Sequence, residues 1–363
     1  MAPSNDAHHL GPPKPAGRVL LITYPRTASN LLVKMISLSD QRNVVSNERG
    51  GYFFWDAFMN ARDTVCSRRP GEQWDPSETA NLRHAFQQNL DHIEATSQAA
   101  LTQGKVFFAK EHTLWLAEPA AMTQYLATGG RSHQPSTRLG VQVPKSYLKA
   151  RATTTPSSSN SSNSAAFSPE NFTILPDAYL ATWRPTFLIR HPALVFPSFY
   201  RALQGLEEES FCEPRMIEPF LELHATLRWT RLLYDWYCDR GDARPPPLLL
   251  DAQDVIHHPE VVTKYCERIG MDPEKVRLTW HQAERRSGEQ EDPRARAEAV
   301  MLATLDRSTS LLKDRTPAFV DVGAERVKWD DEFGSRVAQQ MGRWVDDAMP
   351  DYEYLWRRRL RVD

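Results

Sequence analysis

An anion-binding loop is predicted at residues 23–30 (TYPRTASN), which follow a short apolar segment and open an amphipathic helix. Free backbone N–H groups and the helix dipole favour an anion at such a position. Arg26 can add a forked, charge-assisted contact, and Thr27, Ser29 and Asn30 supply further side-chain donors. The loop lacks the GxxxxGK[ST] pattern of a Walker A motif, and a simple helix cap explains a Ser or Asn here equally well.

A second candidate anion contact combines Arg190 with Ser198. Arg190 ends the apolar segment 186–190 (TFLIR), and Ser198 lies two helical turns further on. An arginine that leaves a strand at the ligand edge of a sheet typically meets an anion. A structural salt bridge is the alternative, and the sequence leaves it open.

His112 and Lys110 are the candidate catalytic residues. They follow the apolar run of residues 105–110 (KVFFAK), and their spacing of two places both side chains on one side of an extended chain. Histidine is suited to accept a proton near neutral pH. A lone histidine is more often structural, so the case for His112 depends on the two anion-binding segments.

Together, these segments resemble the sulfotransferase family. TYPRTASNLL resembles that family's 5′-phosphosulfate loop, and RHPALVFPSFYRA resembles its 3′-phosphate motif. AKEHTLWL is similar to the segment that carries the catalytic histidine of the cytosolic enzymes, and LLLDAQDVIHHPEVVTKYCERIGMDP is similar to a later strand and its helices. The resemblance extends over residues 18–272, apart from a Ser/Thr-rich interruption.

The resemblance implies a donor, an acceptor and a binding site. The donor would be 3′-phosphoadenosine-5′-phosphosulfate (PAPS), and the acceptor would be a hydroxyl or amine of a small molecule. Residues implied to bind the cofactor are Arg26, Thr27, Ala28, Ser29, Asn30, Arg190 and Ser198. Arg190 and Ser198 would hold the 3′-phosphate, and the loop would hold the 5′ side.

The resemblance also implies three catalytic roles. His112 would remove the acceptor's proton, and Lys110 would steady the transferring group. Arg26 would stabilise the charge that grows on the leaving 5′-phosphate. Transfer of this kind needs no metal.

The sequence departs from the family pattern at two places. Ala28 replaces the usual glycine of the loop, so a positive φ there would strain the backbone. The C-terminal R-K-G-x-x-G-x-x-K segment is absent, and residues 307–310 (RSTS) are a candidate substitute.

These departures keep two alternative functions open: a different or PAPS-independent reaction on the same fold, such as elimination, and a non-catalytic nucleotide-binding protein. A P-loop kinase, with residues 248–251 as its Walker B strand, is disfavoured because Gly-Lys-Ser/Thr is missing.

The elements that position these residues alternate between strands and helices. Short apolar strands are predicted at residues 18–23, 105–110, 186–190 and 248–251, and helices around 77–100, 214–240 and 258–270. This order predicts an α/β three-layer sandwich with a central parallel sheet flanked by helices. The family resemblance implies that the sandwich is P-loop NTPase-like.

One domain is expected over residues 18–363, preceded by a disordered leader at 1–17. Residues 151–168 hold ten Ser/Thr among eighteen, and this composition predicts a disordered insertion. Tyr52, Trp55 and Trp115 are candidates for the wall of an apolar acceptor pocket, although aromatic clusters more often form core.

Composition and charge exclude several classes of protein. With 44 Lys+Arg against 46 Asp+Glu, the chain lacks the net positive charge that favours non-specific nucleic-acid binding. The mean hydropathy of −0.54 excludes a polytopic membrane protein. The four cysteines have no zinc-finger spacing and are expected to be free thiols. Neither a signal peptide nor a membrane anchor is visible, so a cytoplasmic protein is expected, without nucleic-acid or membrane partners.

Overall fold

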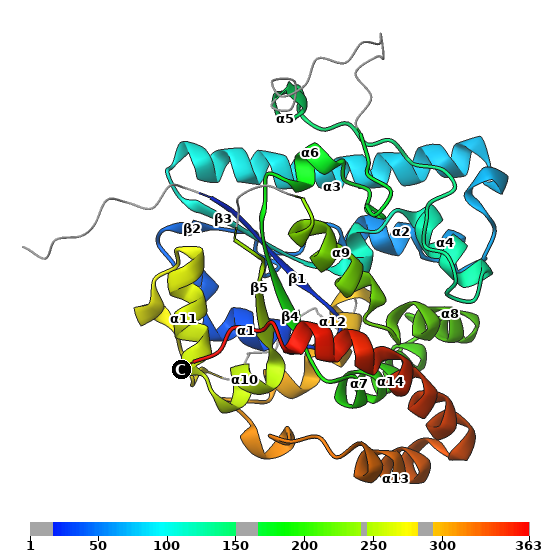
Figure 1. Ribbon diagram of the computed structural model, residues 1–363, viewed down its shortest axis with the longest axis vertical. Helices are drawn as coiled ribbons and strands as arrows, with labels where there is room; N and C mark the ends of the chain where they lie inside the picture. The colour runs from blue at the N-terminus through cyan, green and yellow to red at the C-terminus, as the bar shows by residue number, and fades with distance from the viewer. Residues whose placement is uncertain (1–16, 150–165, 241–244, 282–292, 363) are drawn as a thin grey trace, which may run out of the picture.

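The computed structural model describes residues 17–149, 166–240, 245–281 and 293–362. Within these ranges, five parallel strands form one sheet in the order β2-β3-β1-β4-β5 (Figure 1). They are β1 (Arg18–Thr23), β2 (Val44–Val45), β3 (Val106–His112), β4 (Arg184–Ile189) and β5 (Leu248–Asp251). Because β1 is central, the loop that follows it opens in the middle of the carboxyl edge, where such sheets bind ligands.

Both faces of the sheet are covered, as its apolar strands predict. Along β1, Leu20 and Ile22 enter one buried cluster, and Val19 and Leu21 enter a second cluster on the opposite face. Successive side chains of a strand point to opposite faces, so this alternation requires a layer on each side. The predicted three-layer α/β sandwich is confirmed, and the position of the anion-binding loop after the central strand agrees with a P-loop NTPase-like fold.

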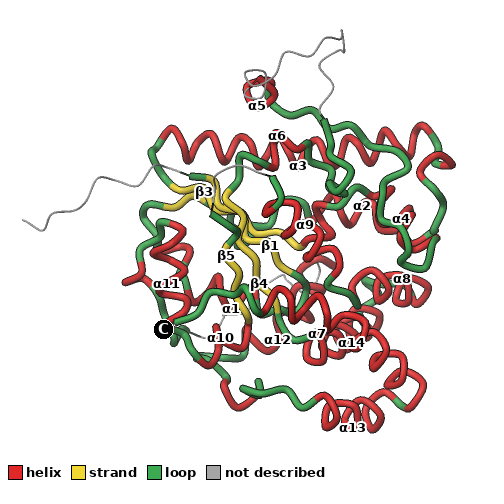
Figure 2. Tube along the Cα trace, in the orientation of Figure 1, coloured by secondary structure: helices red, strands yellow, loops and turns green. Residues whose placement is uncertain are grey.

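Helices form the two outer layers and a third group near the carboxyl edge. In chain order they are α1 (Ser29–Met35), α2 (Trp55–Cys66), α3 (Pro76–Thr102), α4 (Pro119–Ala127), α5 (Lys145–Lys149), α6 (Asp177–Leu180), α7 (Pro192–Glu208), α8 (Pro214–His224), α9 (Arg228–Cys238), α10 (Ala252–His257), α11 (Glu260–Ile269), α12 (Pro293–Asp306), α13 (Val322–Phe333) and α14 (Ser335–Trp356). Helices α2, α3 and α9 pack on one face of the sheet, and α1, α10 and α11 pack on the other (Figure 2). Helices α7, α13 and α14 share a further buried cluster.

Several elements differ from the sequence-based prediction. Strand β4 begins two residues earlier than predicted and ends before Arg190. Strand β3 continues to His112, because residues 111 and 112 still pair with β1. The single helix predicted over residues 214–240 is divided into α8 and α9, with a break at residues 225–227. The two-residue strand β2 was not predicted, since so short a segment has no readable periodicity.

Most of the predicted Ser/Thr-rich insertion, residues 151–165, lies outside the described residues, as does the leader up to residue 16. The last three residues of the predicted insertion are described, and they contact the folded chain. Ser168 Oγ accepts a hydrogen bond of 2.8 Å from Trp236 Nε1. The Arg138 guanidinium lies 3.8 Å from the centre of the Phe167 ring. The folded chain therefore resumes before Ser168.

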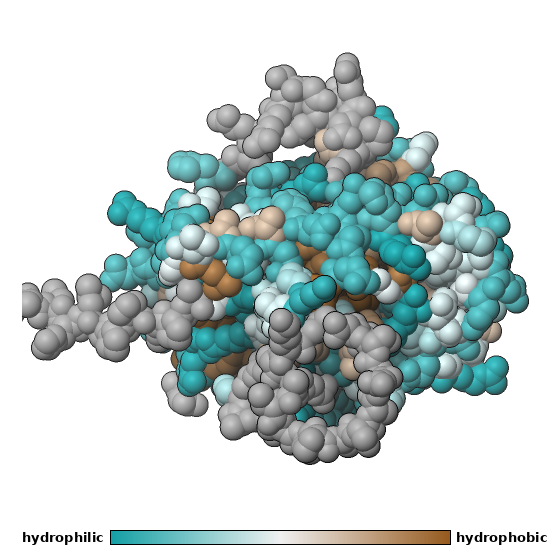
Figure 3. All heavy atoms as spheres, turned by 90° about the horizontal axis from the view of Figure 1, so that it is seen from above, coloured by the Kyte–Doolittle hydropathy of each residue, from teal (hydrophilic) through white to brown (hydrophobic). Residues whose placement is uncertain are grey.

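The surface agrees with the polar composition. Hydrophilic residues predominate on the face shown in Figure 3, with small apolar areas between them. Among the described residues, no helix is both long and apolar enough to cross a bilayer. Cys66, Cys212, Cys238 and Cys266 are free thiols, as expected.

Candidate active site

A cavity of 660 Å³ opens at the carboxyl edge of the sheet, below the loop that follows β1. Its walls come from this loop, the start of α1, one face of α7 and residues 301–317. Among the predicted site residues, those that line it are Arg26, Ala28, Ser29, Asn30, His112, Arg190 and Ser198. Segments that lie far apart in the sequence therefore meet at one cavity, as the strand order requires.

The loop itself is held in a left-handed turn. Arg26 has φ +70° and Ala28 has φ +62°. Position 28 thus has the positive φ for which the sequence predicts strain, and the alanine carries backbone strain of about 1–3 kcal/mol. Ala28 occupies the N-cap of α1 without a side-chain cap. The first N–H groups of α1 therefore lack a capping side chain at the cavity wall.

Thr27 is the predicted loop donor that does not line the cavity. Its hydroxyl donates a hydrogen bond of 2.7 Å to the Tyr24 carbonyl, and its side chain is fully buried. Its backbone N–H donates to the same carbonyl at 3.3 Å. In this structure Thr27 closes the turn rather than offering a donor to a ligand.

Three arginine side chains crowd one end of the cavity. Arg26 Nε donates to Ser198 Oγ at 3.0 Å, and another nitrogen of Arg26 donates to the Met301 carbonyl in α12. Arg190 Nη1 donates to the Arg26 carbonyl at 3.0 Å. Arg201, one turn beyond Ser198 on α7, lines the same cavity and forms a two-pronged ion pair with Glu332.

The electrostatics of this cluster favour a bound anion. Burial lowers the pKa of Arg26, and the nearby charge of Arg201 lowers it further. Burial lowers the pKa of Arg190 to about 10, with a contribution from Arg26. Within the described part of the chain, no carboxylate forms an ion pair with Arg26 or Arg190, and Arg190 Nε is buried without a hydrogen-bond partner. This disfavours the structural salt bridge as the explanation for Arg190.

His112 also lines the cavity, and it lies between two hydroxyl groups. Its Nδ1 is 2.7 Å from Thr23 Oγ1, and its Nε2 is 3.1 Å from the Tyr52 hydroxyl. The Trp115 ring packs edge-on against the imidazole, with centroids 4.4 Å apart. Burial holds the pKa of His112 well below its usual value, and the charge of Lys110 adds to this effect. The imidazole is therefore neutral near pH 7, the state that can accept a proton.

Lys110 lies behind the cavity wall rather than in it. Its side chain is fully buried, and its Nζ donates to Asn30 Oδ1 at 2.5 Å. The same Nζ lies 4.0 Å from the centre of the Tyr52 ring. Burial lowers the pKa of Lys110 to about 7. The charge of Lys110 lies directly behind Asn30 and Tyr52, two residues that line the cavity.

The aromatic residues expected at an acceptor pocket fall into two groups. Tyr52 lines the cavity, and Trp115 packs against both Tyr52 and Trp55. Phe53 and Phe54, the residues between Tyr52 and Trp55, are buried in the core instead. Their backbone N–H groups donate to Glu111 Oε1, on the opposite face of β3 from His112.

Residues 301–316 form a wall of the cavity that the sequence indicated only in part. Ser308 and Ser310, from the proposed substitute segment 307–310, line the cavity, and Arg307 does not. Trp280 anchors this wall, since its backbone N–H donates to the Thr309 carbonyl and its indole N–H to the Ser308 carbonyl, both at 2.9 Å. No sequence signal pointed to Met301 or to this anchoring.

Asp251, which ends β5, does not have the environment of a Walker B carboxylate. Its Oδ1 caps α10 by accepting from the Gln253 N–H, and its Oδ2 accepts from the Tyr352 hydroxyl at 3.1 Å. Burial raises the pKa of Asp251 to about 7. These contacts further disfavour the P-loop kinase alternative.

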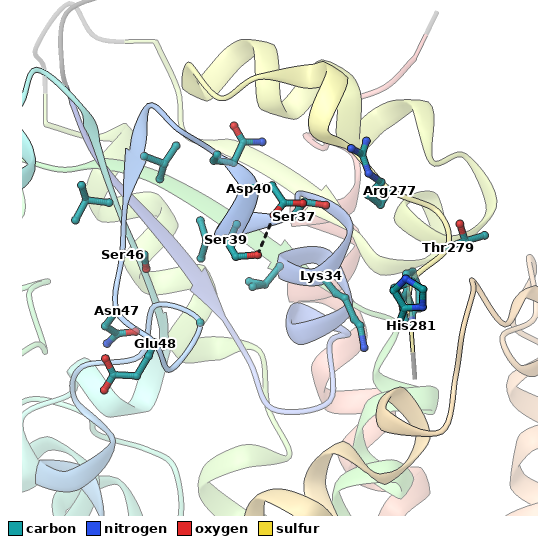
Figure 4. Close-up of a pocket in the computed structure, with 17 residues that line it drawn as sticks. Lys34, Ser37, Ser39, Asp40, Ser46, Asn47, Glu48, Arg277, Thr279 and His281 are labelled. Carbon is teal, nitrogen blue, oxygen red and sulfur yellow. Dashed lines mark hydrogen bonds between the residues drawn. The ribbon is translucent and has the colours of Figure 1, made fainter. Parts of the chain in front are cut away.

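A larger cleft of 1020 Å³ lies on the far side of α1 (Figure 4). Ser46, Asn47 and Glu48 stand on one of its sides, opposite Thr279 and His281. It contains none of the predicted site residues. The candidate active site is therefore the smaller cavity at the carboxyl edge.

Comparisons with known proteins agree with these motifs. The chain is 37% identical over 361 residues to the sulfotransferase ppzF of Metarhizium rileyi (strain RCEF 4871), covering 97% of this chain and 98% of the relative. It is also 37% identical over 362 residues to the sulfotransferase ppzF of Metarhizium majus (strain ARSEF 297), covering 96% and 98%.

Two other comparisons do not contribute to the family classification. No family model matches the chain. The sulfotransferase domain of the Synechococcus PCC 7002 olefin synthase aligns with 89% of this chain and 96% of its own, but at 14% identity and a TM-score of only 0.31. The classification depends on the two relatives, which match almost from end to end at more than a third of positions. The chain belongs to the sulfotransferase family.

Proposed function

We propose that this sulfotransferase moves a sulfuryl group from PAPS to a hydroxyl or amine of a small-molecule acceptor. The main support for this proposal is that the candidate anion site and a neutral histidine line the same cavity. Arg26, Arg190 and Ser198 are linked by hydrogen bonds, and they line the same cavity as His112. The donor, the acceptor class and the residue roles below are parts of this proposal.

The arginine cluster and the start of α1 fit an anionic ligand, and the family resemblance divides these residues between the two phosphate groups of PAPS. Arg190 and Ser198 would hold the 3′-phosphate, because Arg190 has a buried nitrogen without a partner. Arg26, Ser29, Asn30 and the first N–H groups of α1 would hold the 5′ side. When bound, PAPS supplies an activated sulfuryl group on a good leaving phosphate. The arginines would neutralise charge on that phosphate from fixed positions, which costs little reorganisation during the reaction.

His112 would take the acceptor's proton as the acceptor oxygen or nitrogen attacks sulfur. The imidazole is already neutral, and Thr23 fixes its orientation through Nδ1. Tyr52, which lines the cavity, offers aromatic surface suited to a flat or apolar acceptor, and Trp115 packs behind it. Lys110 would act as a positioning residue, because its ammonium holds Asn30 and faces the Tyr52 ring.

Product formation from ³⁵S-labelled PAPS tests the proposal. A panel of phenols, aliphatic alcohols and amines is offered to the wild-type protein and to Arg190→Ala. We expect labelled sulfate esters or sulfamates from the wild type and strongly reduced product from Arg190→Ala. A matched control is Arg49→Ala, which removes an exposed arginine paired with Asp56 away from the cavity. Release of inorganic sulfate with an alkene product would instead indicate elimination, and no turnover with any acceptor would contradict the proposal.

A further inference from the structure

The Tyr52 hydroxyl contacts His112 at the wall of the cavity, and both side chains line it. It lies 3.1 Å from His112 Nε2 and 3.3 Å from Ser29 Oγ. Both Tyr52 and Ser29 line the cavity. The nitrogen expected to take the acceptor's proton is therefore already engaged by a phenol.

The hydrogen bonds around His112 have one consistent direction. Thr23 Oγ1 donates its single proton to the Glu111 carbonyl at 3.1 Å, and it also lies 2.7 Å from His112 Nδ1. With the Thr23 proton directed to the Glu111 carbonyl, we infer that the proton of the second contact comes from Nδ1. A neutral imidazole with its proton on Nδ1 has a free electron pair on Nε2. Tyr52 therefore donates to Nε2, and its own oxygen is left to accept a hydrogen bond from the cavity side.

The Tyr52 ring is fixed by its surroundings. Lys110 Nζ lies 4.0 Å from the ring centre, and the Trp115 ring packs on it with centroids 4.7 Å apart. Asn47 Nδ2 donates to the Tyr52 carbonyl at 2.5 Å. Burial raises the pKa of Tyr52, so the phenol stays protonated at neutral pH. A fixed, protonated phenol can give its proton to His112 while it takes another from the acceptor, but it does not remain as a phenolate.

We propose that Tyr52 is a catalytic residue that relays the acceptor's proton to His112; this rests on the proposed sulfuryl transfer. As the acceptor oxygen forms its bond to sulfur, its proton passes to the Tyr52 oxygen, and the Tyr52 proton passes to His112 Nε2. The bond between sulfur and the 5′-phosphate oxygen breaks, and its electron pair stays with the phosphate. Tyr52 ends neutral, and His112 ends as imidazolium.

The first test needs no catalysis. Protein labelled with ¹⁵N-histidine is examined by NMR, and His112→Asn assigns the His112 signals. We expect the proton on Nδ1 and an unprotonated Nε2. Tyr52→Phe should shift the Nε2 signal, while Tyr147→Phe, which removes a phenol hydroxyl in α5, should leave it in place. Two results would overturn the relay: a proton on Nε2 of His112, or an Nε2 signal that does not shift in Tyr52→Phe. Both can be observed whether or not any acceptor is turned over.

The second test separates proton transfer from packing. Phenol and 4-nitrophenol are compared as acceptors at mildly alkaline pH, where 4-nitrophenol is largely ionised and needs no base. Tyr52→Phe should lower the rate with phenol by about 10²-fold and leave the rate with 4-nitrophenol nearly unchanged. The Tyr52→Phe/His112→Asn double variant should be no slower with phenol than His112→Asn alone, because both act on one path.

Equal losses with both acceptors would mean that Tyr52 only supports packing. An unchanged rate with phenol would mean that the acceptor displaces Tyr52 and meets His112 directly. Either result overturns the relay. Absence of transfer by the wild-type protein with any acceptor contradicts the proposed function instead, and the NMR measurement still decides how Tyr52 and His112 are bonded.

Discussion

His112 shows how a few contacts convert an ordinary histidine into a candidate base. Thr23 holds one ring nitrogen and Tyr52 the other, and Trp115 packs on the ring. Burial and the charge of Lys110 both disfavour the imidazolium. The side chain is therefore held ready to accept a proton, with its orientation set in advance.

Replacing His112 by Asn should lower sulfuryl transfer by about 10²–10⁴-fold. Affinity for adenosine 3′,5′-bisphosphate should be retained, because the phosphates are assigned to Arg26, Arg190 and Ser198. Single-turnover rate, calorimetric affinity and melting temperature are measured on the same samples. A variant that loses thermal stability but transfers sulfate at the wild-type rate per folded molecule would assign His112 a structural role.

The pH dependence follows from the direction of the His112 shift. A base works when neutral, and the pKa of His112 is lowered, so the rate should stay high at the usual histidine pKa and fall only in more acidic solution. The charged or titratable groups that lower this pKa are Lys110 on β3 and His224 on α8. Lys110→Met removes one positive charge, so the acidic limb of the rate profile should move to higher pH. A limb that moves to lower pH contradicts this account of the electrostatics.

Much of the site could be predicted at the level of residues. The types and order of Arg26, Arg190, Ser198 and His112 indicated the anion site and the base. The hydroxyl contacts of His112 could not be predicted, because Thr23 and Tyr52 meet it only through the pairing of β1 with β3 and the course of the chain after β2. The sequence motif also placed the Thr27 and Lys110 side chains at the ligand. In the structure, Thr27 bonds to the Tyr24 carbonyl and Lys110 bonds to Asn30 instead.

At the scale of elements, the loop between β1 and α1 holds its shape at the expense of backbone strain at Ala28. Ala28→Gly should remove this strain, and after the entropy cost of glycine it should stabilise the protein by about 1 kcal/mol. The matched control is Ala95→Gly, at an exposed position in the right-handed helix α3, which should destabilise by about 1 kcal/mol.

Urea unfolding of both variants measures these changes. Bisphosphate affinity should be close to wild type in Ala28→Gly, since the backbone conformation is kept. If Ala28→Gly is destabilised as much as Ala95→Gly, the left-handed conformation at position 28 is not a source of strain.

The elements themselves were predictable where their sequences are long or strongly apolar. Residues 18–23 and 248–251 form strands with the predicted bounds. The end of β3 was placed two residues early, because Glu111 and His112 are polar while their burial is imposed by the neighbouring strand and by partners. The sequence pattern did not indicate the break between α8 and α9 at residues 225–227.

At the scale of the whole molecule, the Ser/Thr-rich segment is expected to contribute little to the folded domain. Deleting residues 151–165 with a short linker should leave the melting temperature and bisphosphate affinity near wild type, because this composition cannot form a core. Extending the deletion to residue 168 removes the hydroxyl that accepts from Trp236 Nε1, at a cost of about 1–3 kcal/mol.

Differential scanning calorimetry on the two deletions compares them directly. A large fall in melting temperature for the shorter deletion would show that residues 151–165 support the fold. Loss of transfer with unchanged stability and unchanged bisphosphate affinity would instead indicate that the segment contributes to the acceptor side.

The overall architecture could be predicted because strands and helices alternate and a parallel sheet buries both faces. The cavity wall from residues 301–316 could not, since its contacts with Arg26 and Trp280 join segments that share no motif. This wall includes Ser308 and Ser310 of the segment predicted as a substitute for the family's Gly- and Lys-rich C-terminal segment. The candidate site is therefore assembled from residues between β1 and the segment that follows α12.

The most direct test of the central claim is to compare the affinities for adenosine 3′,5′-bisphosphate and AMP by titration calorimetry. If Arg190 and Ser198 hold a 3′-phosphate, the bisphosphate should bind about 10- to 150-fold more tightly, the equivalent of a charge-assisted hydrogen bond of about 1.5–3 kcal/mol. Arg190→Ala should remove most of this preference, while Arg49→Ala should keep it. Equal affinity of the wild-type protein for the two nucleotides would contradict the assignment of the cavity to a 3′-phosphonucleotide donor.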